Sequence, residues 1–285
     1  MIRVTTGLAG AAMLVAANVG QTGVLPEVQK DIDEFQGYFK ERFAEVNLEN
    51  YQDGVNSLPQ YAERLANWEL LMEFPPYEQD MDAAREIWAK PFKNGKTLAD
   101  CFKNNPPATK YPYWDEARKE IRTIELDINE CLTTNGEEPI KDLKTGRIAM
   151  LVAAFREQFN DQPWAVDVDS PGAKAAYDMG KKYYWTKRGQ LNFSCANCHV
   201  HNAGNKLRGD VLSAGLGHTT GFPVYRTKWA VAGKPWGTVH RRYGGCNSQV
   251  RAEPLKPQSP EYRALEMYEA VMSTGVPLKV PSQRQ

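Results

Sequence analysis

The stretch Cys195-Ala196-Asn197-Cys198-His199 constrains this chain more than any other feature of its sequence. The pattern C-x-x-C-H is typical of c-type haem attachment, in which two thiols bond to the vinyl groups of the porphyrin and the histidine binds the iron. One helical turn between Cys195 and Cys198 places both sulfur atoms on one side, so that His199 can face the metal. The sequence therefore predicts one covalently bound haem c.

Two other kinds of site also contain closely spaced cysteines. A thioredoxin-like dithiol would follow a strand in an α/β pattern, which this sequence does not show. A zinc site would need a second cysteine pair or a close histidine pair, and His201, His218 and His240 do not supply one. Haem also accounts better for a chain with 18 Pro and 22 Gly, because a bound porphyrin would provide the apolar interior that long loops lack.

Similar residues recur in the same order and indicate an internal duplication. GKTLADC ends at Cys101 and GQLNFSC ends at Cys195, and an aromatic-Pro-x-aromatic unit follows each of them. CLTTNGEEPIK, from Cys131, and CNSQVRAEPLK, from Cys246, then align without a gap, and a helical pattern follows both. The repeat predicts two similar domains, at roughly residues 80–158 and 174–274.

The first copy of the repeat has lost the haem motif. Asn104 and Asn105 stand at the positions that correspond to the second cysteine and the histidine. If the two copies share a fold, Cys101 and Cys131 lie on either side of an emptied haem pocket. We therefore predict a Cys101–Cys131 disulfide, which would stabilise the fold by roughly 3–4 kcal/mol in the chain-entropy model.

These observations predict the fold and its boundaries. Residues 160–174 are rich in Pro, Asp and Gly and are predicted to be a linker. Helix signals dominate, such as Ser259 before Pro260, and alternating runs are few. We predict a mainly α fold with long loops: a degenerate cytochrome c-like domain at residues 24–159 (the first half) and a second such domain at 175–285 (the second half), which alone keeps its haem.

The N-terminus predicts export. Arg3, the apolar run from Leu8 to Ala17 and the small residues after it form the pattern of a secretory signal peptide, at residues 1–23. The run is shorter than the ~20 residues that a membrane-spanning helix needs, and no later segment is long and apolar enough. Lys+Arg and Asp+Glu balance at 35 each, so no net charge favours nucleic acid or an anionic membrane. We expect a protein exported to a compartment where disulfides persist.

These patterns do not determine which residue is the second axial ligand of the iron. Cys246 is the strongest candidate. It is the cysteine left over from the haem motif and the predicted disulfide, and Gly244 and Gly245 beside it would let the backbone approach a ligand closely. Neighbouring arginines favour a thiolate, which lowers the potential of haem iron, and they also suit an oxyanion. These arginines are Arg241, Arg242 and Arg251. The other candidate ligands are Met267, Met272, His218 and His240.

Together these residues resemble the A subunit of the SoxAX cytochromes of bacterial sulfur oxidation. The resemblance covers most of the chain after the signal, and FSCANCH, LRGDVLSAGLGHTTGFPVYR and RRYGGCNSQVRAEP are its most specific stretches. It implies two cytochrome c-like domains, a periplasmic location, a partner X subunit with another haem c, and L-cysteine S-thiosulfotransferase activity. Some members carry two haems in this subunit, and the chain is similar to the single-haem type.

The resemblance also implies a role for each site residue. Cys195 and Cys198 match the covalent haem attachments, and His199 matches the proximal ligand. Cys246 matches the distal ligand, which in this family is also the catalytic cysteine, often found as a persulfide. Arg242 matches the substrate-binding arginine, and Arg251 is a further candidate for that role.

The implied reaction joins thiosulfate oxidatively to a cysteine of the SoxYZ carrier protein, with Cys246 as the sulfur relay. Two electrons would leave through the haem and the X subunit to a soluble cytochrome c. Two alternatives have different chemistry. One is a periplasmic electron-transfer cytochrome c with a methionine opposite His199, and the other is a binding protein whose haem is only structural.

Overall fold

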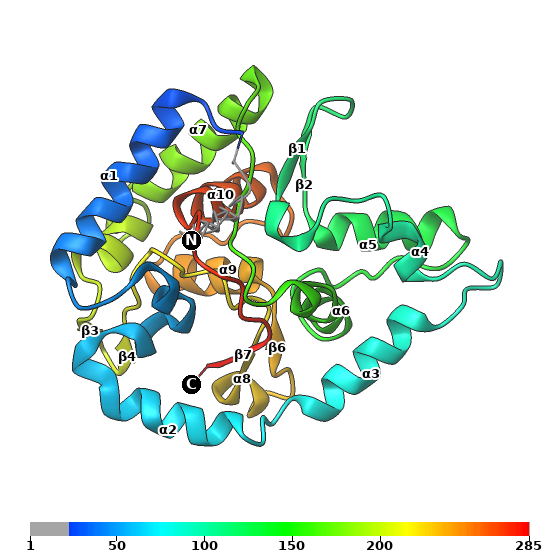
Figure 1. Ribbon diagram of the computed structural model, residues 1–285, viewed down its shortest axis with the longest axis horizontal. Coiled ribbons are helices and arrows are strands. Elements are labelled where there is room, and N and C mark those ends of the chain that lie inside the picture. Colours follow the sequence, from blue (N-terminus) through cyan, green and yellow to red (C-terminus); the bar gives the residue numbers. More distant parts are fainter. Residues whose placement is uncertain (1–22, 285) are drawn as a thin grey trace, which may run out of the picture.

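The computed structural model describes residues 23–284, and its architecture is mainly helical, as predicted (Figure 1). The predicted signal peptide lies outside the described residues, apart from Gly23. The helices are α1 (Pro26–Arg42), α2 (Ala62–Met72), α3 (Glu78–Ala89), α4 (Leu98–Phe102), α5 (Ile124–Thr134), α6 (Arg147–Arg156), α7 (Pro171–Trp185), α8 (Thr227–Ala230), α9 (Val239–Gln249) and α10 (Pro260–Met272).

Short strands connect the helical segments. They are β1 (Tyr113–Asp115), β2 (Glu120–Arg122), β3 (Lys206–Leu207), β4 (Asp210–Val211), β5 (Val224–Arg226), β6 (Trp236–Gly237) and β7 (Ser282–Arg284). β1 pairs with β2 and β3 with β4, both antiparallel, whereas β5 lies between antiparallel β6 and parallel β7. The last pairing brings the C-terminal end of the described chain back beside Arg226.

The helix α10 lies at the centre of the fold (Figure 1). Residues all around it are buried, as expected for a helix that other elements surround. The Ser259 side chain caps its first turn by accepting from the Tyr262 amide, and Pro260 follows at the first helical position, so the predicted helix start is confirmed. Its main neighbour is α7, and Gly180 permits their close approach, because a Cβ there would lie 2.0 Å from the Ala264 carbonyl oxygen.

The helix α1 packs against the second half of the chain as well as against Tyr51 of the first half. The Gln36 amide donates to the Thr274 carbonyl oxygen at 2.8 Å, and the Tyr177 hydroxyl donates to Asp31 at 2.8 Å. The predicted division at residues 160–174 stays a prediction. The contacts of α1 show that a helix from the first half of the sequence is packed against residues of the second half.

The segment 160–174 is packed into the core, although its composition predicts a linker. Trp164, Val166 and Val168 are fully buried, and the Trp164 amide donates to the Val276 carbonyl oxygen at 3.0 Å. The helix α7 already begins at Pro171. The segment therefore ties the two halves together in one continuous core.

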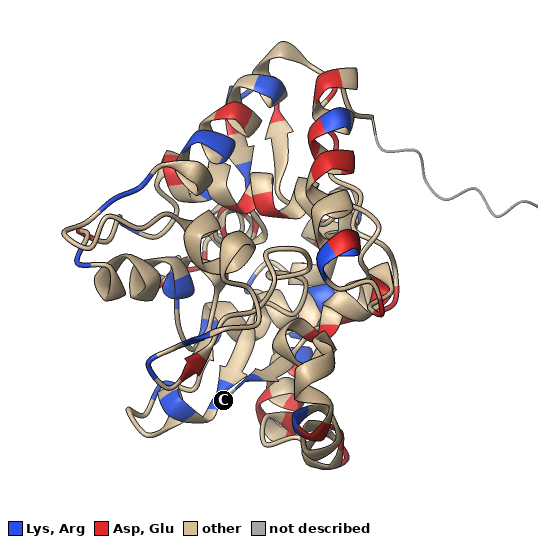
Figure 2. Cartoon of the chain, turned by 90° about the vertical axis from the view of Figure 1, so that its left-hand side faces the viewer, with Lys and Arg blue, Asp and Glu red and all other residues tan. Residues whose placement is uncertain are grey.

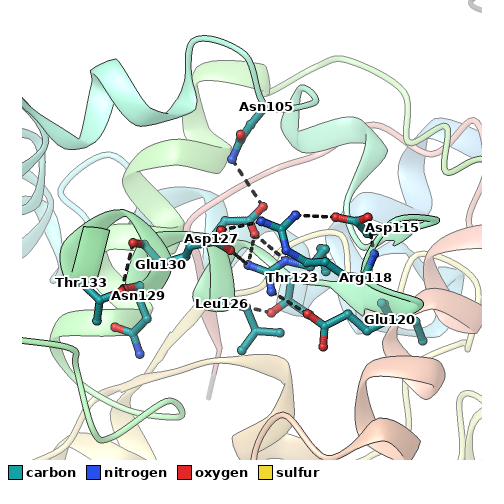
Figure 3. Close-up of polar contacts among 12 residues, drawn as sticks. Asn105, Asp115, Arg118, Glu120, Thr123, Leu126, Asp127, Asn129, Glu130 and Thr133 are labelled. Carbon is teal, nitrogen blue, oxygen red and sulfur yellow. Dashed lines mark hydrogen bonds and ion pairs between the residues drawn. The ribbon is translucent and has the colours of Figure 1, made fainter. Parts of the chain in front are cut away.

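The first half contains the predicted disulfide and a dense polar network (Figure 3). Cys101 on α4 and Cys131 on α5 are bonded, which confirms the pairing. Nearby, the buried Arg122 guanidinium donates to Asp127 at 2.6 and 2.8 Å, and Asp127 also accepts from the Tyr111 hydroxyl. The Glu130 carboxylate belongs to the same network, because it accepts hydrogen bonds from the guanidinium groups of Arg118 and Arg122. Ion pairs thus occupy a region that borders an open, polar hollow beside the disulfide.

The outer surface carries both signs of charge. In the view of Figure 2, Lys and Arg alternate with Asp and Glu along the helices, which agrees with the balanced totals of 35 each. Between residues 23 and 284, no helix has both the length and the apolar character needed to cross a membrane.

Candidate functional site

One cavity brings together most of the predicted site residues. Cys195, Cys198 and His199 line it from the motif, and Arg242 and Cys246 line it from α9. Apolar and aromatic side chains complete the walls, among them Leu212, Tyr243 and Leu265.

The haem motif forms a helical turn, as its spacing predicts. Residues Asn197–His201 form a single π-helical turn. The Ser194 hydroxyl accepts from the Asn197 amide at 3.1 Å, and the Asn197 side-chain oxygen accepts from the Ser194 amide at 3.0 Å. This reciprocal cap fixes where the turn begins and so fixes the direction of both thiols.

The end of the motif turn is held by Arg42, at the last position of α1. Its guanidinium donates to the carbonyl oxygens of Val200 at 2.7 Å, His201 at 2.9 Å and Ala203 at 2.8 Å. These are carbonyls that a short helical turn leaves without partners. The contact explains why α1 packs on the second half: it stabilises the turn that carries His199.

The His199 side chain is prepared to bind a metal ion. It is buried, and its Nδ1 lies 3.0 Å from the Ser213 carbonyl oxygen, so Nδ1 carries the proton and Nε2 is free as a donor to a metal. Burial lowers the pKa of His199 to about 4 and keeps the imidazole neutral. A metal-binding histidine needs this tautomer and charge state.

The two motif thiols are held uncharged. Burial raises the pKa of Cys195 to about 12 and also raises the pKa of Cys198. Such a setting suits neutral thioether sulfur atoms better than redox-active thiolates. The thioredoxin-like alternative, which needs a thiol of low pKa, therefore has no support at this site.

The helix α9 supplies the opposite wall of the cavity. Arg242 and Cys246 are four residues apart and hence lie on the same side of the helix, and both line the cavity. Of the candidate axial ligands, His218 also lines it, but its ring lies 4.2 Å from the ring of His199, the histidine of the motif. Cys246 is thus the candidate that faces the motif from another element.

Several candidates lie elsewhere. Arg241 donates to the carbonyl oxygens of Lys234 and Trp236 and lies 3.9 Å from the centroid of a tryptophan ring, and Arg251 is exposed and does not line the cavity. Met267 and Met272 are buried core residues of α10, and the His240 Nε2 lies 3.1 Å from Glu266. The structure therefore brings Arg242 to Cys246 and leaves Arg241 and Arg251 away from it.

Glu269 is a site residue that the sequence analysis did not identify. It lines the cavity from α10, and burial raises its pKa to about 8. The Tyr243 hydroxyl donates a hydrogen bond to its carboxylate. An acidic residue on the buried side of a core helix is a sequence signal that could have indicated it.

The donor set fits a haem rather than a bare metal ion. Among the residues that the structure describes, no group of three or more His, Cys, Asp and Glu side chains could hold a metal. A porphyrin supplies four nitrogen ligands itself, so an imidazole from one wall and a sulfur from the other are sufficient. Two further thiols at the edge of the same cavity complete the requirements of a covalently bound haem.

Comparisons with known proteins agree with this chemistry. A family model described as "SoxA/TsdA, cytochrome c domain" matches residues 83–163. The chain is 45% identical to the L-cysteine S-thiosulfotransferase subunit SoxA of Chlorobaculum tepidum over 90% of its length and 88% of that protein. It is 40% identical to the protein of the same name from Allochromatium vinosum, over 99% of its length and 97% of that protein. The chain belongs to the SoxA family.

A solved structure extends the likeness to the fold. The crystal structure of SoxXA from P. pantotrophus matches with a TM-score of 0.65 and 30% identity, covering 74% of this chain and 79% of that chain. The matched family model lies in the first half, which lacks the C-x-x-C-H motif. The chain therefore carries a cytochrome c family signature outside the segment that carries the haem motif.

Proposed function

We propose that this chain is the catalytic haem subunit of an L-cysteine S-thiosulfotransferase, which oxidatively joins thiosulfate to a cysteine of the SoxYZ carrier protein. The observation that carries the proposal is the common cavity of the haem motif, Arg242 and Cys246. The names of the two relatives above support the reaction class.

The chain's own residues would hold one haem c. Cys195 and Cys198 would form the thioether bonds, and His199 and Cys246 would be the axial ligands of the iron. When bound, the haem supplies an acceptor for one electron at a time. The neutral thiols and the fixed tautomer of His199 support this assignment.

Arg242 and Cys246 would handle the substrate. The guanidinium of Arg242 offers a planar pair of donors to the oxygen atoms of thiosulfate, one helical turn from the sulfur of Cys246. Cys246 would relay sulfur through a persulfide or thiosulfonate adduct. In the net reaction a sulfur–sulfur bond to the carrier cysteine forms, its S–H bond breaks, and one proton and two electrons are released. Arg251 is not part of this proposal because it is exposed and away from the cavity.

Two electrons need acceptors beyond a single haem. We propose a heterodimer with a SoxX-type haem c subunit, which the likeness to SoxXA supports, and a soluble cytochrome c as the next acceptor. The predicted signal peptide and the disulfide support a periplasmic location.

The first half is proposed to be a degenerate copy of the second. Cys131 and Cys246 both lie in the last turn of an 11-residue helix, α5 and α9. The family model for a cytochrome c domain matches the first half, where the disulfide takes the place of haem attachment.

A Cys246→Ala variant tests the proposal. We expect it to retain covalent haem by intact mass but to lose thiosulfate turnover with the carrier and partner subunits, whereas Arg242→Ala should raise the KM for thiosulfate and leave the haem spectrum largely unchanged. Full thiosulfate turnover by Cys246→Ala would refute the role of Cys246 as the sulfur relay. A colourless wild-type chain after proper maturation would refute the haem assignment.

A further inference from the structure

A second cavity adjoins the first on the side away from the motif thiols. It shares His199, His218 and Arg242 with the first cavity, but neither Cys195 nor Cys198 lines it. Arginines reach it from four separate elements. They are Arg64 of α2, Arg226 of β5, Arg242 of α9 and Arg284 of β7.

Two of these arginines are direct neighbours across the sheet. Arg226 and Arg284 face each other in the parallel register of β5 and β7. Like charges at opposed positions destabilise a sheet. Burial and then repulsion from Arg242 lower the pKa of Arg226 to about 10, and burial and then repulsion from Arg226 lower the pKa of Arg284 to about 10. Asp210 is the acidic residue among the described residues that line the cavity, and Lys228 lies 3.7 Å from its carboxylate.

The Arg284 guanidinium is fixed in place by its surroundings. Its Nε and Nη2 atoms are buried without a hydrogen-bond partner in the described structure. It packs on Gly54, where φ is +59° and a Cβ would lie 2.4 Å from Nη1, and it lies 5.8 Å from the centroid of the Phe222 ring. Buried donors of a charged group cost free energy unless a partner is bound, so the site is built for an anion.

We propose that Arg226 and Arg284 bind the two propionate carboxylates of the haem c. This inference rests on the proposed function, which places the haem in the first cavity. The vinyl edge of the porphyrin is tied to Cys195 and Cys198, and the propionates project from the opposite edge. The arginine cavity adjoins the first cavity through His199 on the side without thiols. Two carboxylates would neutralise two opposed guanidinium groups through charge-assisted hydrogen bonds.

The position of the two residues argues against direct contact with thiosulfate at Cys246. Arg242 lines both cavities, whereas Arg226 and Arg284 line the second but not the first, and Cys246 lines the first but not the second. A substrate held beside Cys246 would thus meet Arg242. The paired arginines therefore act on the cofactor and tune its potential.

The test compares Arg226→Gln and Arg284→Gln with a matched control, Arg147→Gln, an exposed residue at the start of α6. Each matured protein is measured by intact mass, spectroelectrochemical titration, resonance Raman spectroscopy of the propionate bending modes, and KM for thiosulfate. We expect both variants to keep covalent haem, to shift the propionate bands and to lower the midpoint potential, because loss of a neighbouring positive charge favours ferric haem. The control should match the wild type. Arg284→Lys keeps the charge, so its potential should stay near that of the wild type. Should Arg284→Gln fail to fold, Arg226→Gln alone decides the test.

Unchanged potential and propionate bands in both Gln variants would overturn the inference. If the KM for thiosulfate rises in that case, the second cavity binds external oxyanions instead. The inference and the proposed function fail in different ways: a wild-type chain without covalent haem refutes both, whereas a haem protein that is indifferent to Arg226 and Arg284 refutes the inference alone.

Discussion

The disulfide of the first half allows a quantitative prediction of stability. Replacing both Cys101 and Cys131 with alanine opens a crosslink between residues separated by 30 positions. In the chain-entropy model, closing a loop of this length lowers the entropy of the unfolded chain enough to stabilise the fold by about 3.6 kcal/mol. The two sulfur atoms lie near the polar hollow of the first half, so alanine at both positions leaves no new buried unpaired group.

Urea unfolding and thermal unfolding of the haem-loaded chain measure this effect. We expect the free energy of unfolding to fall by about 3.6 kcal/mol and the melting temperature to fall by roughly 7–14 °C, since ~1 kcal/mol corresponds to ~2–4 °C for a chain of this size. The haem spectrum should be unchanged, because the disulfide and the haem motif line different cavities. The wild type in a strong reductant is the control and should lose a similar amount. A loss below about 1 kcal/mol would refute the crosslink argument and assign the stability of the first half to the ion pairs around Arg122.

Two further predictions concern helix packing and the pH dependence of stability. Gly180→Ala should destabilise the fold by ~1–3 kcal/mol, because its Cβ would lie 2.0 Å from the Ala264 carbonyl oxygen, while Gly37→Ala in α1, where a Cβ meets nothing within 4 Å, should stabilise it by ~0.5–1 kcal/mol. Differential scanning calorimetry of the two variants measures these changes in stability. Equal effects of the two substitutions on stability would contradict the close contact between α7 and α10. Burial raises the pKa of Glu269 from 4.5 to about 8, so between these values the folded chain holds a proton that the unfolded chain has released, and stability should fall as pH rises through this window. In Glu269→Gln, urea midpoints measured across this window should vary less with pH, and an unaltered slope would show that other groups cause it.

The predictions confirmed by the structure depend on local spacing. The C-x-x-C-H turn follows from covalent geometry that leaves little freedom, and the start of α10 follows from Ser259 and Pro260. The disulfide was predictable because the repeat aligned Cys101 and Cys131 with cysteines of the haem site. In each case a few neighbouring residues, or a repeat of them, contain the information.

Features that depend on long-range contacts could not be predicted from the sequence. Composition marks 160–174 as a linker, yet Trp164 lies in the core, because its neighbours come from the end of the chain. Arg251 is close to Cys246 in sequence but exposed, while Arg284, far away in sequence, is drawn beside the motif by the pairing of β7 with β5. Sequence proximity therefore identified Arg242, one helical turn from Cys246, but could not identify arginines from other elements. A site whose charge is assembled across four elements can be recognised only when the pairing of the strands is known.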